Sequence, residues 1–283
     1  FPFHKWQLSA MTAPTPASAL MHAGFVNGSG ILLSLFATML IASHALDILF
    51  IIGGLTAIVA QFTKLIQVNV KQRLACSTIA QMGFMIMQCG LGFFNAAITH
   101  LILHGFYKAS LFLSSGEEIQ QSNPTAPPII RIRWFQAIIV VLFSLAGAFL
   151  FARLTGKGMH WDSSIFLTLV ASIAVGQATY NIVRQQILKG WQKLALPFLV
   201  FLSGIGMYSL FYNWVTDLMS DMAVVSVHMP VSTLQMGFGA VFLIGFFLMK
   251  LGVYRKIPWI YVKLMNLSQP HKKTILTYKT ENQ

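Results

Sequence analysis

Charge is scarce in this sequence, and acidic charge is the scarcest. Only 9% of the 283 residues are charged, and Asp and Glu together number 7. A soluble domain carries about 25% charged residues, so this chain has too few to cover a soluble surface. The net charge of +12 would suggest nucleic-acid binding in a soluble protein. In a membrane protein, basic loops set the orientation, and we therefore expect no nucleic-acid partner.

Cysteine and the motifs of cofactor chemistry are scarce too. Cys76 and Cys89 share one apolar run, and on a helix about 20 Å would separate them, too far for a disulfide. There is no CxxC pair, no set of closely spaced metal ligands and no Walker motif. Gly237-Phe238-Gly239 lies within an apolar span, where glycines serve packing. We therefore expect no cofactor, no metal and no catalytic chemistry of the chain's own.

Long apolar runs are what the sequence has in excess. Hydrophobic residues make up 56% of the chain, and runs of about 18 or more mark membrane-spanning helices. We predict an all-α fold, a polytopic membrane helical bundle with about eight transmembrane helices. The runs are 17–42, 46–63, 74–94, 95–115, 134–152, 163–182, 194–214 and 231–252.

Basic residues divide unequally between the two sets of loops that these helices would produce. One set holds only Arg153 and Lys157. The positive-inside rule places the richer set in the cytoplasm. We therefore expect a multi-pass protein of the cell inner (plasma) membrane, in contact with membrane lipid, with both ends of the chain cytoplasmic. The richer set holds Lys5, Lys64, Lys71, Arg73, Arg131, Arg133, Arg184, Lys189, Lys193, Arg255, Lys256, Lys263, Lys272, Lys273 and Lys279.

Composition divides the chain into four segments. Residues 1–116 hold the first apolar runs, and the polar, proline-containing stretch 117–133 is interpreted as a cytoplasmic linker. Residues 134–254 hold the remaining runs, and 255–283 form a basic tail with interleaved aromatics, suited to an amphipathic helix on the membrane surface. The chain starts at Phe1, without Met or a signal-peptide pattern, so we expect the C-terminal part of a larger protein.

The fourth run contains three titratable residues at helical spacing. His100, His104 and Lys108 follow at every fourth position, so on a helix they form one polar stripe about 12 Å long. Titratable groups inside a membrane cost on the order of several kcal/mol and need a reason to be there. Histidine titrates near neutral pH, and a buried lysine can release its proton. Other polar residues of the runs include His22, Asn27, Gln81, Gln88 and Gln177.

We interpret the stripe as part of a hydrated proton path, because groups about 6 Å apart on one helix face can be joined by single waters. Two other interpretations stay open. Each histidine could bond to a neighbouring helix. The His-x3-His pair could also bind zinc, although no carboxylate or cysteine lies nearby in sequence to complete the ligand set.

Three blocks of the sequence resemble a known family. They are Pro2 to Ala23 (PFHKWQLSAMTAPTPASALMHA), Asn69 to Met85 (NVKQRLACSTIAQMGFM) and Ala97 to Gly116. Together they resemble the proton-conducting antiporter-like membrane subunits of the NADH dehydrogenase subunit 5 and Mrp antiporter type. Pro14 and Pro16 cannot continue a helix interior, which agrees with a broken helix in that family.

The resemblance implies roles for five residues of a proton path. Lys108 is similar to the central lysine of the family's second half-channel, and His100 and His104 are similar to the histidines that connect it to its neighbours. His22 stands at the place of the residue that bridges the half-channels. Lys71 matches the lysine that follows a helix break. The lysine and glutamate of the first half-channel would lie upstream of the chain's first residue.

The rest of the chain departs from the respiratory subunits. Asn69 stands where these commonly carry aspartate, and 134–152 has no ionisable residue where they carry a Ser-Lys-Asp motif. The ending Pro258 to Pro270 (PWIYVKLMNLSQP) is similar to the DabB-type membrane subunit of two-component inorganic-carbon transporters. That resemblance implies a soluble cytoplasmic zinc-containing partner subunit.

The leading hypothesis is therefore a membrane subunit that translocates protons, or sodium ions, and energises uptake of inorganic carbon (bicarbonate or CO2) with that partner. The alternatives are a proton-pumping membrane subunit of an NADH–quinone oxidoreductase, an Mrp-type cation/proton antiporter subunit, and a structural membrane scaffold. The stripe of His100, His104 and Lys108 argues against the scaffold.

Overall fold

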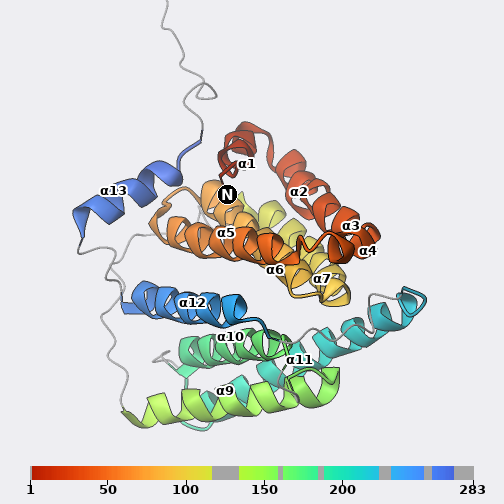
Figure 1. The fold of residues 1–283 in the computed structure, drawn as a ribbon. Coiled ribbons are helices and arrows are strands. Elements are labelled where there is room, and N and C mark those ends of the chain that lie inside the picture. The colour runs from red at the N-terminus through yellow and green to blue at the C-terminus, as the bar shows by residue number, and fades with distance from the viewer. Residues whose placement is uncertain are drawn as a thin grey trace, which may run out of the picture. The chain divides into compact units, whose positions relative to one another are not determined.

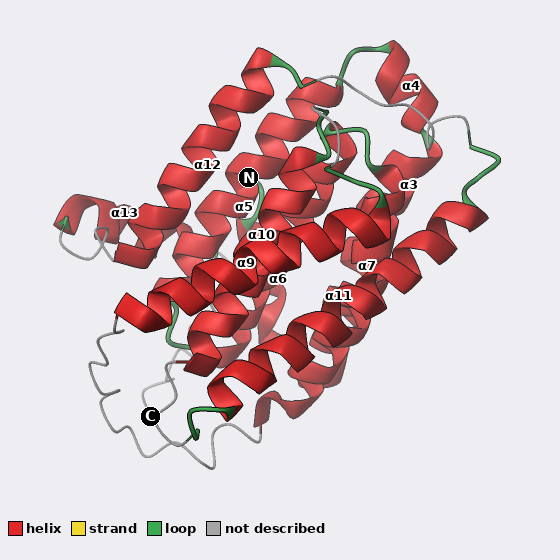
Figure 2. Cartoon of the chain, turned by 90° about the horizontal axis from the view of Figure 1, so that it is seen from below, coloured by secondary structure: helices red, strands yellow, loops and turns green. Residues whose placement is uncertain are grey.

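The computed structural model describes residues 2–116, 134–158, 162–183, 188–222, 231–251 and 257–270. Every regular element named for these residues is helical (Figure 1, Figure 2). The predicted all-α fold is confirmed. The linker predicted at 117–133 and the part of the predicted tail after residue 270 lie outside the described residues.

The chain forms two compact units, and the first is discontinuous in sequence. The first unit contains α1 (Lys5–Ser9), η1 (Ala10–Thr12), α2 (Thr15–Ala23), η2 (Phe25–Asn27), α3 (Gly28–Leu35), α4 (Ala37–Ala42), α5 (Leu46–Ile66), α6 (Val70–Gly90), α7 (Phe94–Leu113), η3 (Ser114–Gly116), α12 (Thr233–Leu251) from its second residue, and α13 (Pro258–Leu267). The second unit contains α9 (Trp134–Thr155), α10 (Ile165–Val183) and α11 (Gln192–Leu218).

Breaks interrupt the first apolar run. Ala13 and Pro14 are extended, each with a ψ of 154°, and Pro16 lies in the first turn of α2, where a missing N–H costs no helical bond. We predicted one span over 17–42, but the helix is interrupted at Gly24 and Phe36. A Cβ on Gly24 would lie 2.9 Å from the Leu20 carbonyl oxygen, so glycine suits the first interruption.

The helices α5 and α6 pack along each other and form the centre of the first unit (Figure 1). Two facing glycines allow this close contact. A Cβ on Gly83 would lie 2.7 Å from the Ala57 nitrogen and 2.8 Å from the Gly53 carbonyl oxygen. A Cβ on Gly53 would lie 2.5 Å from the Met87 nitrogen. Small residues at such contacts let the backbones of membrane helices approach each other.

The sharp start of α6 has a side-chain cause. Asn69 is extended, with a ψ of 125°, and its Oδ1 accepts hydrogen bonds from the backbone nitrogens of Lys71 at 3.0 Å and Gln72 at 3.4 Å. An asparagine in this position satisfies N–H groups that have no partner within the helix. An asparagine can therefore cap the start of α6 at a position where the respiratory subunits commonly carry aspartate.

The helix α12 returns to the first unit and packs on α5. The ring of Phe238 meets the ring of Phe50 edge-on, with 5.2 Å between centroids. Gly54 lies directly beneath Phe238, where any Cβ would clash with the ring. An aromatic side chain seated on a glycine fixes where the two helices cross.

The helix α13 is held at the end of the first unit that contains α1 (Figure 1). Nε2 of His4 donates to the Leu267 carbonyl oxygen at 3.0 Å, and Nε2 of Gln67 donates to the Ser268 carbonyl oxygen at 2.6 Å. Burial lowers the pKa of His4, so its ring is neutral at neutral pH and carries only one N–H to donate. These bonds tie residues at the start of the chain to residues far along it.

The second unit is a bundle of α9, α10 and α11, each packed on the other two. Gly147 of α9 receives Val175 of α10, whose side-chain carbons would lie 2.7 Å from a Cβ on that glycine. The turn before α10 is closed by Asp162, whose Oδ1 accepts hydrogen bonds from the Ser164 nitrogen at 2.9 Å and from the Ser164 hydroxyl. This unit carries none of the five residues assigned to the proton path.

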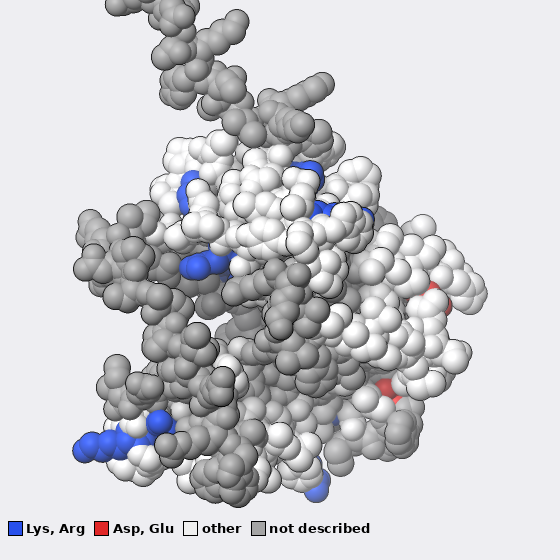
Figure 3. All heavy atoms as spheres, turned by 90° about the vertical axis from the view of Figure 1, so that its left-hand side faces the viewer, with Lys and Arg blue, Asp and Glu red and all other residues white. Residues whose placement is uncertain are grey.

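The outer surface suits a lipid environment. Long apolar side chains such as Leu142, Phe149, Met207 and Leu210 are exposed on the second unit. Charged atoms are few among the described residues on the face shown in Figure 3. Such exposure would be costly in water and is normal in a bilayer. The chain is therefore a multi-pass membrane protein.

Helix number agrees approximately with the prediction, because each of the predicted runs contains described helix. Six segments are long and apolar enough to cross a membrane: Thr15–Leu35, Leu46–Ile66, Phe94–Leu113, Ile138–Thr155, Ile165–Val183 and Gln192–Leu218. The helix α6 is long enough, but Arg73, Gln81 and Gln88 lower its hydropathy. The helix α12 contributes a shorter apolar stretch, Thr233–Phe242.

We predict that Gly83→Ala destabilises the first unit by about 1–3 kcal/mol, the usual cost of overpacking, because the new methyl group meets backbone atoms that cannot move aside. Thermal unfolding of the purified protein in detergent measures the effect. Gly237→Ala is the matched control, since a Cβ there meets nothing within 4 Å. An equal unfolding midpoint for Gly83→Ala and wild type would contradict close packing of α5 on α6.

Candidate functional site

The predicted stripe lies on α7 and faces the interior of the first unit. Lys108 is completely buried, and His104 is 6% exposed. His100 is partly buried, and its ring lies parallel to that of His104 with 5.9 Å between centroids. Phe84 of α6 covers His100, with 5.5 Å between ring centroids. The structure therefore brings the three titratable residues together against neighbouring helices.

The ammonium group of Lys108 has a backbone partner. Its Nζ donates to the carbonyl oxygen of Leu74 on α6 at 3.3 Å. The same carbonyl accepts a hydrogen bond from the Thr78 hydroxyl at 3.2 Å. No described carboxylate pairs with Lys108. A buried cation without a counter-charge is costly, so its stability depends on polar groups nearby.

The histidines of the stripe have unused hydrogen-bonding capacity. Both ring nitrogens of His104 and Nε2 of His100 are buried without a partner among the described residues. Oδ1 of Asn27 and Oε1 of Gln88 are in the same condition. Buried polar atoms in native proteins bond to protein groups or water in the great majority of cases. Water molecules are therefore the partners that we expect for these atoms.

His22 joins the cluster from α2. It is completely buried, and its ring stacks on Phe112 of α7 with 4.6 Å between centroids and an interplanar angle of 19°. Nε2 of Gln7 lies 3.1 Å from Nδ1 of His22, within hydrogen-bond distance, while Nε2 of His22 has no partner among the described residues. Gly105 of α7 helps this approach, because a Cβ there would lie 3.0 Å from the Ala23 carbonyl oxygen at the end of α2.

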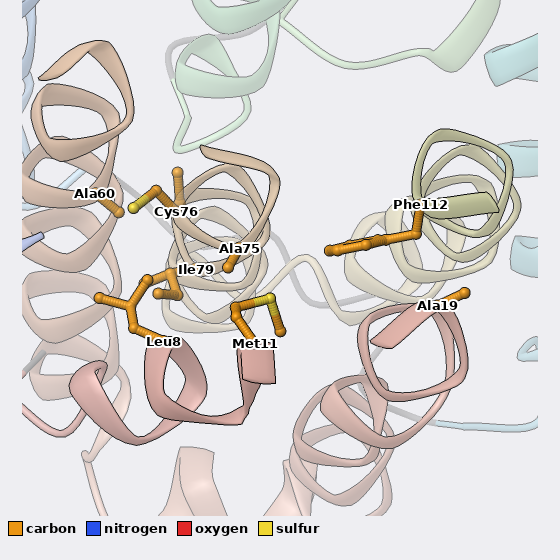
Figure 4. Close-up of a cluster of buried hydrophobic side chains, with 9 residues drawn as sticks. Leu8, Met11, Ala19, Ala60, Ala75, Cys76, Ile79 and Phe112 are labelled. Carbon is orange, nitrogen blue, oxygen red and sulfur yellow. The ribbon is translucent and has the colours of Figure 1, made fainter. Parts of the chain in front are cut away.

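A hydrophobic cluster holds these elements in place. Leu8 and Met11, from the segment before α2, point toward Ala75 and Ile79 of α6, and Phe112 reaches in from α7 (Figure 4). The other buried members are Ala19, Ala60, Cys76 and Ala80. The segment containing Gln7 is thus anchored by its apolar neighbours rather than by charge.

Lys71 lies at the first turn of α6, and its surroundings differ from those of a stripe residue. Its Nζ donates to the carbonyl oxygen of Ala13 at 2.5 Å, in the extended segment before α2. Lys71 therefore ties the start of α6 to the helix break. It also lies within electrostatic range of His22, as does Lys108.

Sequence reasoning missed two side chains next to the predicted site residues. Lys64 was assigned to a loop, but it lies half-buried in the last turn of α5, within electrostatic range of Lys108. Lys64 follows the apolar run directly, with no turn-forming residue between them, and this could have indicated that the helix continues through it. Gln7 was noted only as part of a family block, and no periodicity within a five-residue helix could have indicated its contact with His22.

The remaining polar residues separate into two groups. Asn27 and Gln88 are buried in the first unit, where Nδ2 of Asn27 also donates to the Ala23 carbonyl oxygen at 2.5 Å. Gln81 is partly buried on α6. Gln177 belongs to the second unit, where its amide nitrogen donates to Asn181 at 3.4 Å. Within the described ranges, no three His, Cys, Asp or Glu residues gather where a metal ion could be held.

Comparison with known proteins agrees with this arrangement. The family described as NADH:quinone oxidoreductase/Mrp antiporter, TM, matches residues 1–154. The chain is 37% identical over 185 residues to the "Probable inorganic carbon transporter subunit DabB" of Hydrogenovibrio crunogenus, covering 63% of this chain and 36% of that protein. It is 46% identical over 124 residues to the protein named DabB1 of Halothiobacillus neapolitanus, covering 44% and 22%.

A respiratory protein is also similar. The chain is 43% identical over 122 residues to "NADH-ubiquinone oxidoreductase chain 5" of Dictyostelium discoideum, covering 42% of this chain and 18% of that protein. The matched region spans about a third of the length of several DabB relatives. More than half of the chain matches the family itself. The chain therefore belongs to the transmembrane family of NADH:quinone oxidoreductase and Mrp antiporter proteins.

Proposed function

We propose that the chain is part of a membrane subunit that translocates protons, with sodium ions as the alternative cargo. The observation that carries the proposal is the cluster of His22, His100, His104 and Lys108 inside the first unit, in which Nε2 of His22, Nε2 of His100 and both ring nitrogens of His104 are buried without a partner among the described residues. Each of these groups can gain and lose a proton, and water molecules between them would complete a path for proton transfer. A purely structural role does not explain why a completely buried lysine has no carboxylate partner among the described residues.

The residues of the proposed path come from three helices of the first unit. The α7 residues form its central part, His22 connects it to α2, and Lys71 stands at the start of α6 beside the helix break. Lys64 adds a second positive charge near Lys108. Two neighbouring cations disfavour simultaneous protonation, so a proton arriving at one favours release from the other.

We propose further that this subunit energises uptake of inorganic carbon together with a soluble, zinc-containing cytoplasmic partner. The extent of the similarities supports this choice. Four of the relatives named as probable inorganic carbon transporter subunits match 59% to 74% of this chain and a fifth matches 44%, whereas the NADH-ubiquinone oxidoreductase chain 5 relatives match 42%. The similarity to the first group therefore extends further along the chain. The inner membrane and cytoplasmic ends of the chain belong to the same proposal.

The second candidate is a proton-pumping membrane subunit of an NADH–quinone oxidoreductase. It is favoured by the 43% identity over 122 residues to chain 5 of Dictyostelium discoideum. Both candidates use the same path and differ in what the ion flow drives. Their partners therefore distinguish them.

We predict that Lys108→Ala in the full-length protein lowers proton flux by about a hundredfold or more, the usual effect of losing a positioned proton-transfer group. Membrane insertion should be unchanged, because removing a buried charge does not disfavour the helix in lipid. Lys108→Arg should fail as well, because a guanidinium does not release its proton in proteins. A pH-sensitive dye inside proteoliposomes measures the flux.

Arg153→Ala is the control for this experiment, because Arg153 is exposed in the last turn of α9 and lies outside the proposed docking stretches. It should retain wild-type flux and yield. Normal flux in Lys108→Arg would show that the lysine acts only as a fixed charge. Normal flux in Lys108→Ala would exclude the path through α7.

We predict that the full-length protein co-purifies from native membranes with a soluble zinc-containing subunit. Its docking surface is expected at 116–133, at 183–193 or in the tail after Arg255, and the last two carry net basic charge that can attract an acidic partner. The described part of the tail exposes Trp259, with the Lys263 ammonium 4.8 Å from its ring centroid, a pairing suited to a membrane surface or an interface.

Mass spectrometry and metal analysis of the purified complex provide the measurement. Recovery together with quinone-reductase subunits would replace the carbon-uptake proposal by the second candidate. Recovery of the protein alone, with ion flux intact, would show that no partner is required.

A further inference from the structure

Gln7 makes the one hydrogen bond that the structure gives to the ring of His22. The amide nitrogen of Gln7 lies 3.1 Å from Nδ1 of His22. An amide NH2 group can only donate, so Nδ1 must accept and cannot carry a proton. In the neutral ring the proton therefore lies on Nε2.

The other ring nitrogen of His22 makes no such bond to the described part of the chain. Nε2 of His22 is buried and has no partner among the described residues. The titratable groups within electrostatic range of the ring are Lys108 and His104 on α7 and Lys71 on α6. All three are cationic or become so on protonation, so none of them favours a second proton on His22. A proton can enter or leave the ring through Nε2 without disturbing Gln7.

Gln7 itself is held firmly. It is half-buried on α1, next to Leu8, which is 1% exposed and packs against α6. His4, at the other end of α1, is bonded to the Leu267 carbonyl oxygen. The stacking of His22 on Phe112 fixes the plane of the ring, and the bond from Gln7 fixes which edge of the ring faces α1.

We propose that Gln7 is a positioning residue that holds neutral His22 in the Nε2–H tautomer, so that the ring exchanges protons through its Nε2 edge. The proposal rests on the proton translocation proposed above. It adds that one nitrogen of His22 is reserved for orientation and the other for transfer. Gln7 acts through His22 and carries no proton itself.

Two substitutions of Gln7 have different expected effects. Gln7→Leu keeps the approximate size and removes the donor, which should change the tautomer ratio of His22 and lower proton flux, each by about fivefold, as expected for one neutral hydrogen bond. Gln7→Glu replaces the donor by a carboxylate that favours a proton on Nδ1 and a charged ring. The pH midpoint of flux should then move upward by about one unit or more.

Nitrogen-15 NMR of the full-length protein in liposomes, labelled at histidine, reads the tautomer directly. The His22 signals are identified by their loss in His22→Asn. We expect an unprotonated Nδ1 and a protonated Nε2 in wild type, mixed tautomers in Gln7→Leu, and a protonated Nδ1 in Gln7→Glu. Gln61→Leu on α5 is the matched control, because Gln61 is also half-buried and has no hydrogen bond among the described residues. It should change neither tautomer nor flux.

The outcomes separate this proposal from the proposed function. A protonated Nδ1 in wild type, or a Gln7→Leu protein with unchanged tautomer and unchanged pH profile of flux, would overturn the role of Gln7. Equal loss of flux in Gln7→Leu and Gln7→Glu, with no shift of the pH midpoint in either, would indicate a merely structural side chain. Absence of flux in wild type would refute proton translocation, while the NMR measurement would still decide the tautomer.

Discussion

The ammonium group of Lys108 imposes the strictest requirement on the first unit. A completely buried cation inside a membrane helix needs polar partners, and the Leu74 carbonyl oxygen is the one that the structure provides directly. That carbonyl must therefore face α7, which fixes how α6 is rotated. The position of α6 in turn depends on the glycine contacts with α5 and on the cap at Asn69. The apolar packing of α5 on α6 thus helps to hold the Leu74 carbonyl oxygen beside Lys108.

The helix break before α2 lets side chains from separate elements meet. The extended backbone at Ala13 and Pro14 allows α1 to lie across α6 while α2 packs on α7. In a continuous helix, Gln7 and His22 would be too far apart for their side chains to form a hydrogen bond. The Ala13 carbonyl oxygen, freed from a helical bond, accepts from Lys71 instead. The break is therefore both a turn in the chain and a source of polar contacts.

Much of this arrangement could be predicted from the sequence, and the limit has a physical basis. Apolar runs show where helices occur, and the spacing of four residues between His100, His104 and Lys108 places them on one helix face. Pattern alone does not show which residues from distant segments touch. The return of Phe238 to Gly54, the bond from Gln7 to His22 and the burial of Lys64 all depend on tertiary packing. The interruption at Gly24 also escaped prediction, because its flanking residues are apolar.

The discontinuity of the first unit has a consequence for biogenesis. The helices α12 and α13 are translated only after the whole second unit, which at usual ribosome speeds means a delay on the order of ten seconds. During that interval Gly54 and Phe50 have no Phe238 to cover them, and the side chains of His4 and Gln67 have no α13 to bond to. Lipid chains can cover the first surface, but the polar groups need water or an insertion factor. Maturation of the early helices therefore waits for the late ones.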